Sequence, residues 1–194
     1  MAKSEDFLFF IKAQIYPYKS IIIFILKAIV IYFILKYIFL GYVGLVDDGG
    51  GYHSPFLARY SLIQLLVEII AWPTRGILVL LGYDTFAYLN VVGIEGAAGV
   101  RILFPCLGVE MMIAWFALIF SYPSKTAKWK AIFLGIAGIF VINIIRVLYL
   151  LLTQYHNPGV KLIRTHDIFN NVVYVFIFIA FMLYLRHVGK KEEE

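Results

Sequence analysis

Long, nearly uninterrupted apolar runs constrain the fold of this 194-residue chain more than any other feature. Hydrophobic residues make up 62% of the sequence and charged residues 15%, whereas about a quarter of a soluble domain is charged. A helix of about 20 apolar residues is long enough to cross the hydrocarbon layer of a membrane, and several runs reach that length. The sequence therefore predicts a membrane protein that crosses the bilayer several times.

We predict an all-α polytopic membrane protein with four to five transmembrane helices, one kinked or re-entrant helix and a short extracytoplasmic β-hairpin. Residues 1–194 form a single membrane domain. Its segments are an interfacial helix (1–18), a span (20–46), a kinked, re-entrant or spanning segment (55–82), the hairpin (88–104) and three further spans (106–122, 131–153 and 171–187).

The segment at 55–82 is apolar but carries a polar stripe, and Pro73 interrupts it. Polar side chains within hydrocarbon must face protein or water. We therefore prefer an interfacial or re-entrant segment, which leaves the N-terminus on the cytoplasmic side; a full crossing would place the N-terminus outside. The stripe consists of Ser61, Gln64, Glu68 and Arg75.

Two strand-like stretches, 88–95 and 100–104, flank the turn sequence Gly96-Ala97-Ala98-Gly99 and predict the hairpin. It must lie outside the bilayer, because open sheet edges leave backbone polar groups unpaired in hydrocarbon. Pro105 suits the first turn of a helix, so we expect the next span to begin with Cys106 at its N-terminus.

Lysines set the orientation of the chain in the membrane. The loop that holds Lys125, Lys128 and Lys130 contains no acidic residue, which is typical of a cytoplasmic loop. Cys106 then lies at the outer face and the C-terminus lies inside. Since the net charge of +5 reports this orientation, we do not predict nucleic-acid binding, and we see no motif for a metal or another cofactor.

Three side chains that could take part in catalysis are expected in the outer half of the membrane: Cys106, Arg146 and His166. A cysteine attacks as the thiolate, which a helix N-terminus and a nearby guanidinium both stabilise. His166 would accept the thiol proton and later return it to a leaving amine. Arg146 would alternatively hold an oxyanion or a substrate carboxylate.

Three further residues are candidates for supporting roles. Asn143 shares a helix face with Arg146 and is best suited to a hydrogen bond between helices. Glu110 follows Cys106 by four residues, so it pairs with Arg146, positions His166, or packs as a protonated carboxyl. Asp167 is better placed to cap the last helix than to orient His166.

The order of Cys106-Leu107-Gly108, Asn143-x-x-Arg146 and His166-Asp167 before a final span resembles the exosortase/archaeosortase family over residues 94–188. The resemblance implies a membrane cysteine transpeptidase or protease, with Cys106 as nucleophile, Arg146 as cation and His166 as base. It implies a multi-pass protein of a prokaryotic inner membrane whose site faces outward. The implied substrates are secreted precursors with a C-terminal hydrophobic sorting signal. Leu107 stands where many members have Ser or Asn, which leaves the subgroup and its sorting motif open.

Two other functional interpretations remain open. The first is a non-catalytic membrane module of a secretion or polysaccharide-export complex, in which the cysteine never ionises. The second, a small transporter, is less favoured because the sequence shows no inverted repeat. Membrane lipid is an expected partner in every case, and the sequence does not predict the oligomeric state.

Overall fold

The computed structural model describes residues 18–46, 61–88, 90–124, 128–158 and 163–192, and for residues 163–168 it describes the backbone alone. The predicted interfacial helix lies almost entirely outside the described residues. The elements are α2 (Lys19–Val46), α4 (Leu62–Leu80), β1 (Thr85–Tyr88), β2 (Val91–Ile94), β3 (Val100–Arg101), the 3-10 helix η2 (Phe104–Leu107), α5 (Val109–Ser121), α6 (Lys128–His156) and α7 (Ile163–Glu192).

Four of the helices in the described part of the chain are long and apolar enough to cross a membrane: α2, α4, α6 and α7. Helix α5 is equally apolar but has only 13 residues. These elements confirm the predicted fold class, and the chain is a multi-pass membrane protein.

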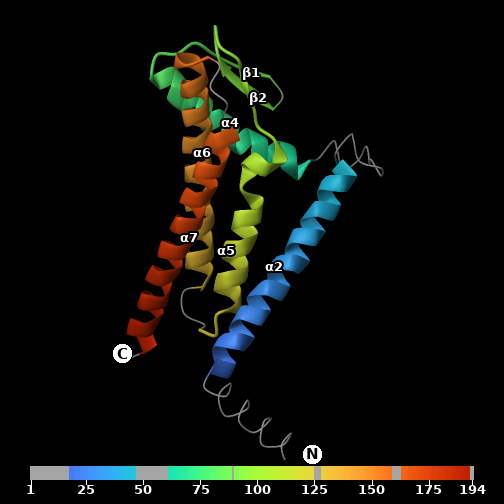
Figure 1. Cartoon of the computed structure of the whole chain (residues 1–194), viewed down its shortest axis with the longest axis vertical. Coiled ribbons are helices and arrows are strands. Elements are labelled where there is room, and N and C mark those ends of the chain that lie inside the picture. The colour runs from blue at the N-terminus through green and yellow to red at the C-terminus, as the bar shows by residue number, and fades with distance from the viewer. Residues whose placement is uncertain (1–17, 47–60, 89, 125–127, 159–162, 193–194) are drawn as a thin grey trace, which may run out of the picture.

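Helices α2, α5, α6 and α7 run along the length of the molecule, and the sheet lies at one end (Figure 1). We call this the sheet end, and the opposite end, where α2 begins and α7 ends, the far end. Helix α5 packs against both α2 and α6, and α7 packs against α6. Helix α4 lies beside the sheet-end half of α6, inclined to the other helices in Figure 1.

Helix α4 continues through Pro73 instead of ending there. The Ser61 hydroxyl caps its start by accepting from the backbone N–H of Gln64, and Thr74 donates its hydroxyl to the carbonyl of Ile70. The helix tolerates the missing backbone donor of Pro73 because packing against α6 holds it on both sides of that position. The polar stripe has local partners: Gln64 donates to Glu68, and Arg75 donates to Thr85 of β1.

The predicted hairpin is a three-stranded antiparallel meander in the order β1-β2-β3. Strands β2 and β3 confirm the predicted hairpin, and its first strand was wrong only in its start, because the chain turns after Tyr88 and that residue belongs to β1. The carbonyl of Asn90 in this turn accepts from the backbone N–H of Ile102. The turn directs three of the four residues of β2 into the core.

The core divides into two clusters of buried side chains. The sheet-end cluster joins α4, the sheet, η2 and the last turns of α6; it includes Ile70, Val92, Ile102, Leu107 and Leu151. The far-end cluster joins α5, α6 and α7; it includes Trp115, Ile119, Ile139, Ile177 and Tyr184. The only cysteine, Cys106, packs against the sheet-end cluster.

Candidate active site

Cys106 lies in η2, the 3-10 turn that precedes α5, and not at the N-terminus of a membrane-spanning helix. Its backbone N–H donates to the carbonyl of Leu103. Gly108 then adopts a left-handed conformation, with φ of 69°, and α5 begins at Val109. The predicted span at 106–122 was therefore wrong at its start, because the left-handed glycine separates the thiol from the helix.

Arg146 of α6 approaches this turn from across the bundle. Its Nη2 atom lies 3.9 Å from Sγ of Cys106, although the two residues are 40 positions apart in the chain. The Arg146 side chain is only 3% exposed, and its Nε has no hydrogen-bond partner among the described residues. A buried guanidinium is costly unless an anion or hydrogen bonds compensate its charge. Sequence reasoning thus brought the correct two residues together.

Asn143 fixes the turn that carries the thiol. Its Nδ2 donates to the carbonyl of Leu107 over 3.1 Å, and both residues are almost fully buried. Asn143 lies one helical turn before Arg146, so a single face of α6 holds both the backbone of η2 and the cysteine side chain. This contact confirms the expected role of Asn143 as a hydrogen bonder between elements.

Gly108 also belongs to the site, although the sequence analysis assigned it no role. A Cβ on Gly108 would collide with the side-chain amide of Asn143. Glycine is therefore required at this position for two reasons: the backbone has a positive φ, and the Asn143 side chain leaves no space for a Cβ. The signal in the sequence was a glycine just after the short turn that follows Pro105, where a left-handed residue commonly ends a helical turn.

Glu110 forms an ion pair with Lys36 of α2, with 3.1 Å between Nζ and Oε1. The expectation that Glu110 shares a face with Cys106 was wrong, and of the alternatives left open for it the structure shows neither a pair with Arg146 nor an unpaired, packed carboxyl. The rule that residues four apart share a face holds only within one continuous helix, and Gly108 interrupts the helix between these two residues. Glu110 instead faces a groove of about 340 Å³ between α2, α5 and α7, beside Tyr32 and Tyr174. Lys36 was not predicted as its partner.

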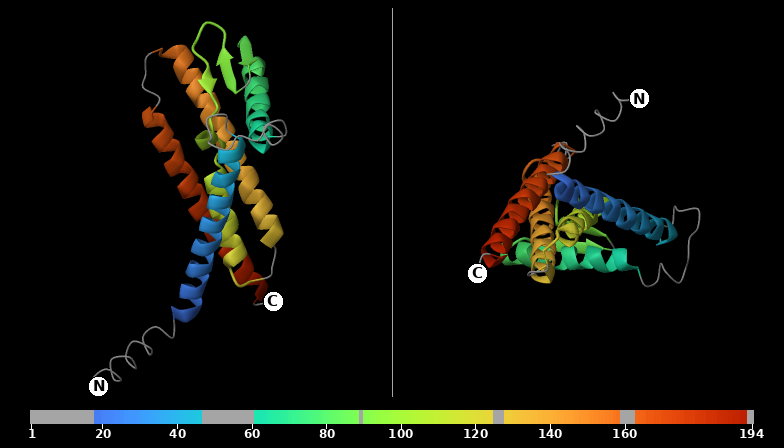
Figure 2. Two further views of the ribbon diagram at one scale, coloured as in Figure 1. Left: turned by 90° about the vertical axis from the view of Figure 1, so that its right-hand side faces the viewer. Right: turned by 90° about the horizontal axis from the view of Figure 1, so that it is seen from below.

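His166 and Asp167 lie on α7, which begins at Ile163, and not in a loop before it. Asp167 is therefore inside the helix and cannot cap its first turn. The side chains of His166 and Asp167 are not among those that the structure describes. In Figures 1 and 2, α7 begins lower than α6 ends, so its first turns run beside α6 below the end of that helix. The described histidine of the neighbouring segment, His156, has Nδ1 3.0 Å from the carbonyl oxygen of Leu152 and packs on two tyrosine rings.

Within the described ranges, no group of three His, Cys, Asp or Glu side chains is arranged to hold a metal ion. The geometry offers a thiol, a buried guanidinium and a clamped backbone turn. Such an arrangement suits nucleophilic chemistry in which a cation offsets negative charge on sulfur or oxygen.

Comparison with protein families gives one match, to the model described as transmembrane exosortase (Exosortase_EpsH), over residues 53–184. The matched range covers more than half of the chain and contains all six predicted site residues. Searches of curated proteins and of solved structures gave no match.

Proposed function

The chain belongs to the transmembrane exosortase family, and from this premise we propose that it is a cysteine transpeptidase of the membrane surface. Its substrates are secreted precursor proteins that carry a C-terminal hydrophobic sorting signal. The reaction takes place at the sheet end, which faces the outside of a prokaryotic inner membrane.

The approach of Arg146 to Cys106 is the observation that supports this proposal best. Arg146 is 3% exposed, and its Nη2 is 3.9 Å from the sulfur. A thiolate at this position would compensate the buried positive charge, and the guanidinium would in turn favour the thiolate. In the acylation step, the same cation would stabilise the oxyanion that forms on the substrate carbonyl.

The reaction proceeds in two balanced steps. His166 takes the thiol proton, and the sulfur of Cys106 attacks the carbonyl carbon of the peptide bond. The carbon–nitrogen bond breaks, the leaving amine receives the proton from His166, and a thioester remains on Cys106. An acceptor amine or a water molecule then attacks the thioester and restores the thiol.

The sheet end also provides a reason for cleavage beside the bilayer and not within it. The reactive turn η2 connects the sheet to α5, so it lies where the chain passes from strands to a membrane helix. Open strands require water or protein around their edges. A substrate that docks its hydrophobic segment along the bundle would present the peptide bond next to that segment at this level.

The experiment that tests the proposal is alkylation of Cys106 in native membranes near neutral pH. We expect wild-type protein to react rapidly and Arg146→Ala and His166→Ala to react at least about tenfold more slowly, since a cation within about 4–6 Å favours the thiolate by one or more powers of ten. Arg186→Ala and His187→Ala are matched controls, because they remove the same chemical groups from the far end of α7.

A second measurement links reactivity to function. Cys106→Ala should accumulate in the membrane at the wild-type level but release no processed product from a secreted reporter that carries a sorting signal. Normal processing by Cys106→Ala would refute the proposal. Slow alkylation that neither Arg146→Ala nor His166→Ala changes would instead favour the non-catalytic module.

A further inference from the structure

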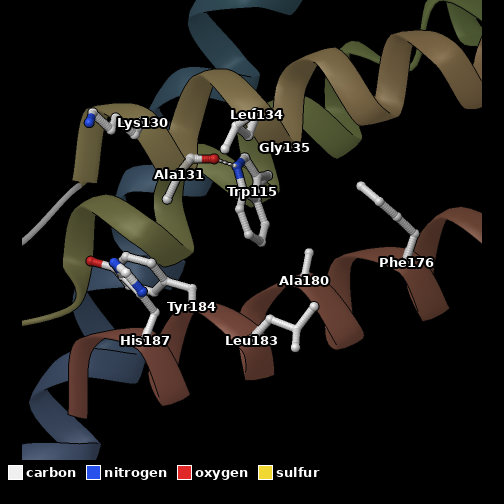
Figure 3. A pocket seen from close by; sticks show the side chains of 10 residues that line it. All are labelled: Trp115, Lys130, Ala131, Leu134, Gly135, Phe176, Ala180, Leu183, Tyr184 and His187. Carbon is white, nitrogen blue, oxygen red and sulfur yellow. Dashed lines mark hydrogen bonds between the residues drawn. The ribbon is translucent and has the colours of Figure 1, made fainter. Parts of the chain in front are cut away.

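A pocket of about 390 Å³ lies at the far end of the bundle, away from Cys106. It is a groove between α6 and α7, and Trp115 of α5 forms its floor (Figure 3). We propose that this groove binds one acyl chain of an anionic phospholipid, whose phosphate is held by Lys130 and His187. This site is independent of the transpeptidase chemistry.

Two small residues create the groove. Gly135 of α6 has no side chain, and a Cβ there would collide with the indole of Trp115, which occupies that space. Trp115 is held in place because its Nε1 donates to the carbonyl of Ala131 over 3.0 Å. On the opposite wall, Ala180 leaves room between the larger side chains of α7 (Figure 3). The groove therefore has a fixed floor and is not filled by its own walls.

The groove opens sideways, toward lipid. Leu134 and Leu183 lie on its two walls and are 73% and 61% exposed, as expected for side chains that face hydrocarbon in a membrane protein. Its lining is predominantly apolar. A flexible acyl chain fits such a narrow lateral groove, and its methylene groups gain dispersion contacts with the groove walls.

Lys130 on the α6 wall and His187 on the α7 wall lie at the same end of the groove (Figure 3). Both side chains are exposed. The neighbouring Lys128 instead binds the protein backbone, because its Nζ donates to the carbonyl oxygens of Phe120 and Tyr122. We therefore assign the phosphate to Lys130, whose ammonium group would bind it from the α6 wall while an imidazole N–H of His187 would donate to it from the α7 wall.

Among the side chains that the structure describes, the acidic groups lie away from the groove. The described acidic side chains belong to α4, the sheet region and the first turn of α5, all toward the sheet end: Glu68, Asp84, Glu95 and Glu110. Arg186 and Lys190 add positive charge to the far end. This distribution favours an anionic headgroup at the groove and disfavours a cationic one.

The test is retention of phosphatidylglycerol or phosphatidylcholine by the purified full chain, measured by native mass spectrometry. Wild-type protein should retain one phosphatidylglycerol in preference to phosphatidylcholine. Lys130→Ala should weaken this retention about fivefold, the effect of one basic residue near an anionic lipid surface. Lys130→Ala combined with His187→Ala should weaken it further.

Two variants separate a specific site from general attraction. Ala180→Phe fills the groove without changing charge and should reduce phosphatidylglycerol retention. Lys190→Ala removes an exposed cation of α7 that does not line the groove and should have little effect. The proposal is overturned if Lys190→Ala acts as strongly as Lys130→Ala, or if lipid retention is the same in wild-type protein and in the Lys130/His187 double variant. Lys130 is exposed, so its variant tests the site even if Ala180→Phe fails to fold.

Discussion

The sheet end and the far end of this molecule are built by different means. At the sheet end, the backbone is irregular and a few polar contacts fix it: Asn143 holds the carbonyl of Leu107, and Arg146 approaches the sulfur of Cys106. At the far end, three regular helices meet through apolar side chains and close approaches such as Gly135 to Trp115. Polar contacts thus hold an irregular turn where chemistry is proposed, whereas the far end combines apolar packing with hydrogen bonds from Trp115 and Lys128 to backbone carbonyls.

This difference implies that the two ends respond differently to mutation. Damage at the sheet end should change thiol reactivity and stability together, because the same contacts serve both. Damage at the far end should change stability alone, since no described contact links that cluster to the sulfur.

The largest effect is expected for Gly108→Ala. The substitution forces a side chain onto a left-handed backbone, at a cost of about 1–3 kcal/mol, and its Cβ displaces Asn143. We expect Cys106 alkylation to fall to the rate of an ordinary buried thiol. Gly82→Ala is the matched control, because Gly82 also has a positive φ, of 86°, but open space around it. Equal loss of reactivity in both variants would contradict the role assigned to the Asn143 contact.

Asn143→Asp should have the next largest effect. The carboxyl group keeps the size of the amide but, when ionised, cannot donate to the Leu107 carbonyl, and leaving that buried group unpaired costs about 1–3 kcal/mol. Slower alkylation and a lower unfolding temperature should appear together. Wild-type reactivity in this variant would show that η2 is positioned without the hydrogen bond.

Gly135→Ala probes the far end. Its Cβ would collide with Trp115, and overpacking of this kind typically costs about 1–3 kcal/mol. The unfolding temperature should fall while the rate of Cys106 alkylation in the folded protein stays unchanged. Adding Trp115→Phe, which removes part of the clashing ring, should recover part of the lost stability. A reduced alkylation rate would show that the two ends are coupled.

Lys36→Ala should have the smallest effect. The ion pair with Glu110 is partly exposed, at 28% and 45% of the two side chains, and such pairs contribute about 0.2–1 kcal/mol. Both alkylation and unfolding temperature should stay close to wild type. A large loss of reactivity in Lys36→Ala, reproduced by Glu110→Gln, would place this pair in the active site after all.

Much of this arrangement was predictable from the sequence, and two of the exceptions share one cause. Long apolar runs identified the helices, and the spacing of Cys106 and Arg146 along antiparallel helices brought them to one level. The role of Glu110 was missed because helical spacing was applied across Gly108, where the helix is broken. The start of the strand at 88–95 was misplaced similarly, because the turn at Asn90 carries no glycine or proline to mark it. The periodicity of apolar residues therefore predicted the helices and strands but not the positions at which tertiary contacts interrupt them.

The separation of 40 residues between Cys106 and Arg146 has a consequence during synthesis of the protein on the ribosome. While the ribosome is still adding α6, the cysteine has already been made but its cation has not yet arrived. The thiol of an unfinished chain therefore lacks the partner that would activate it. Under the proposed mechanism, reactivity would therefore appear only after α5 and α6 have packed against each other.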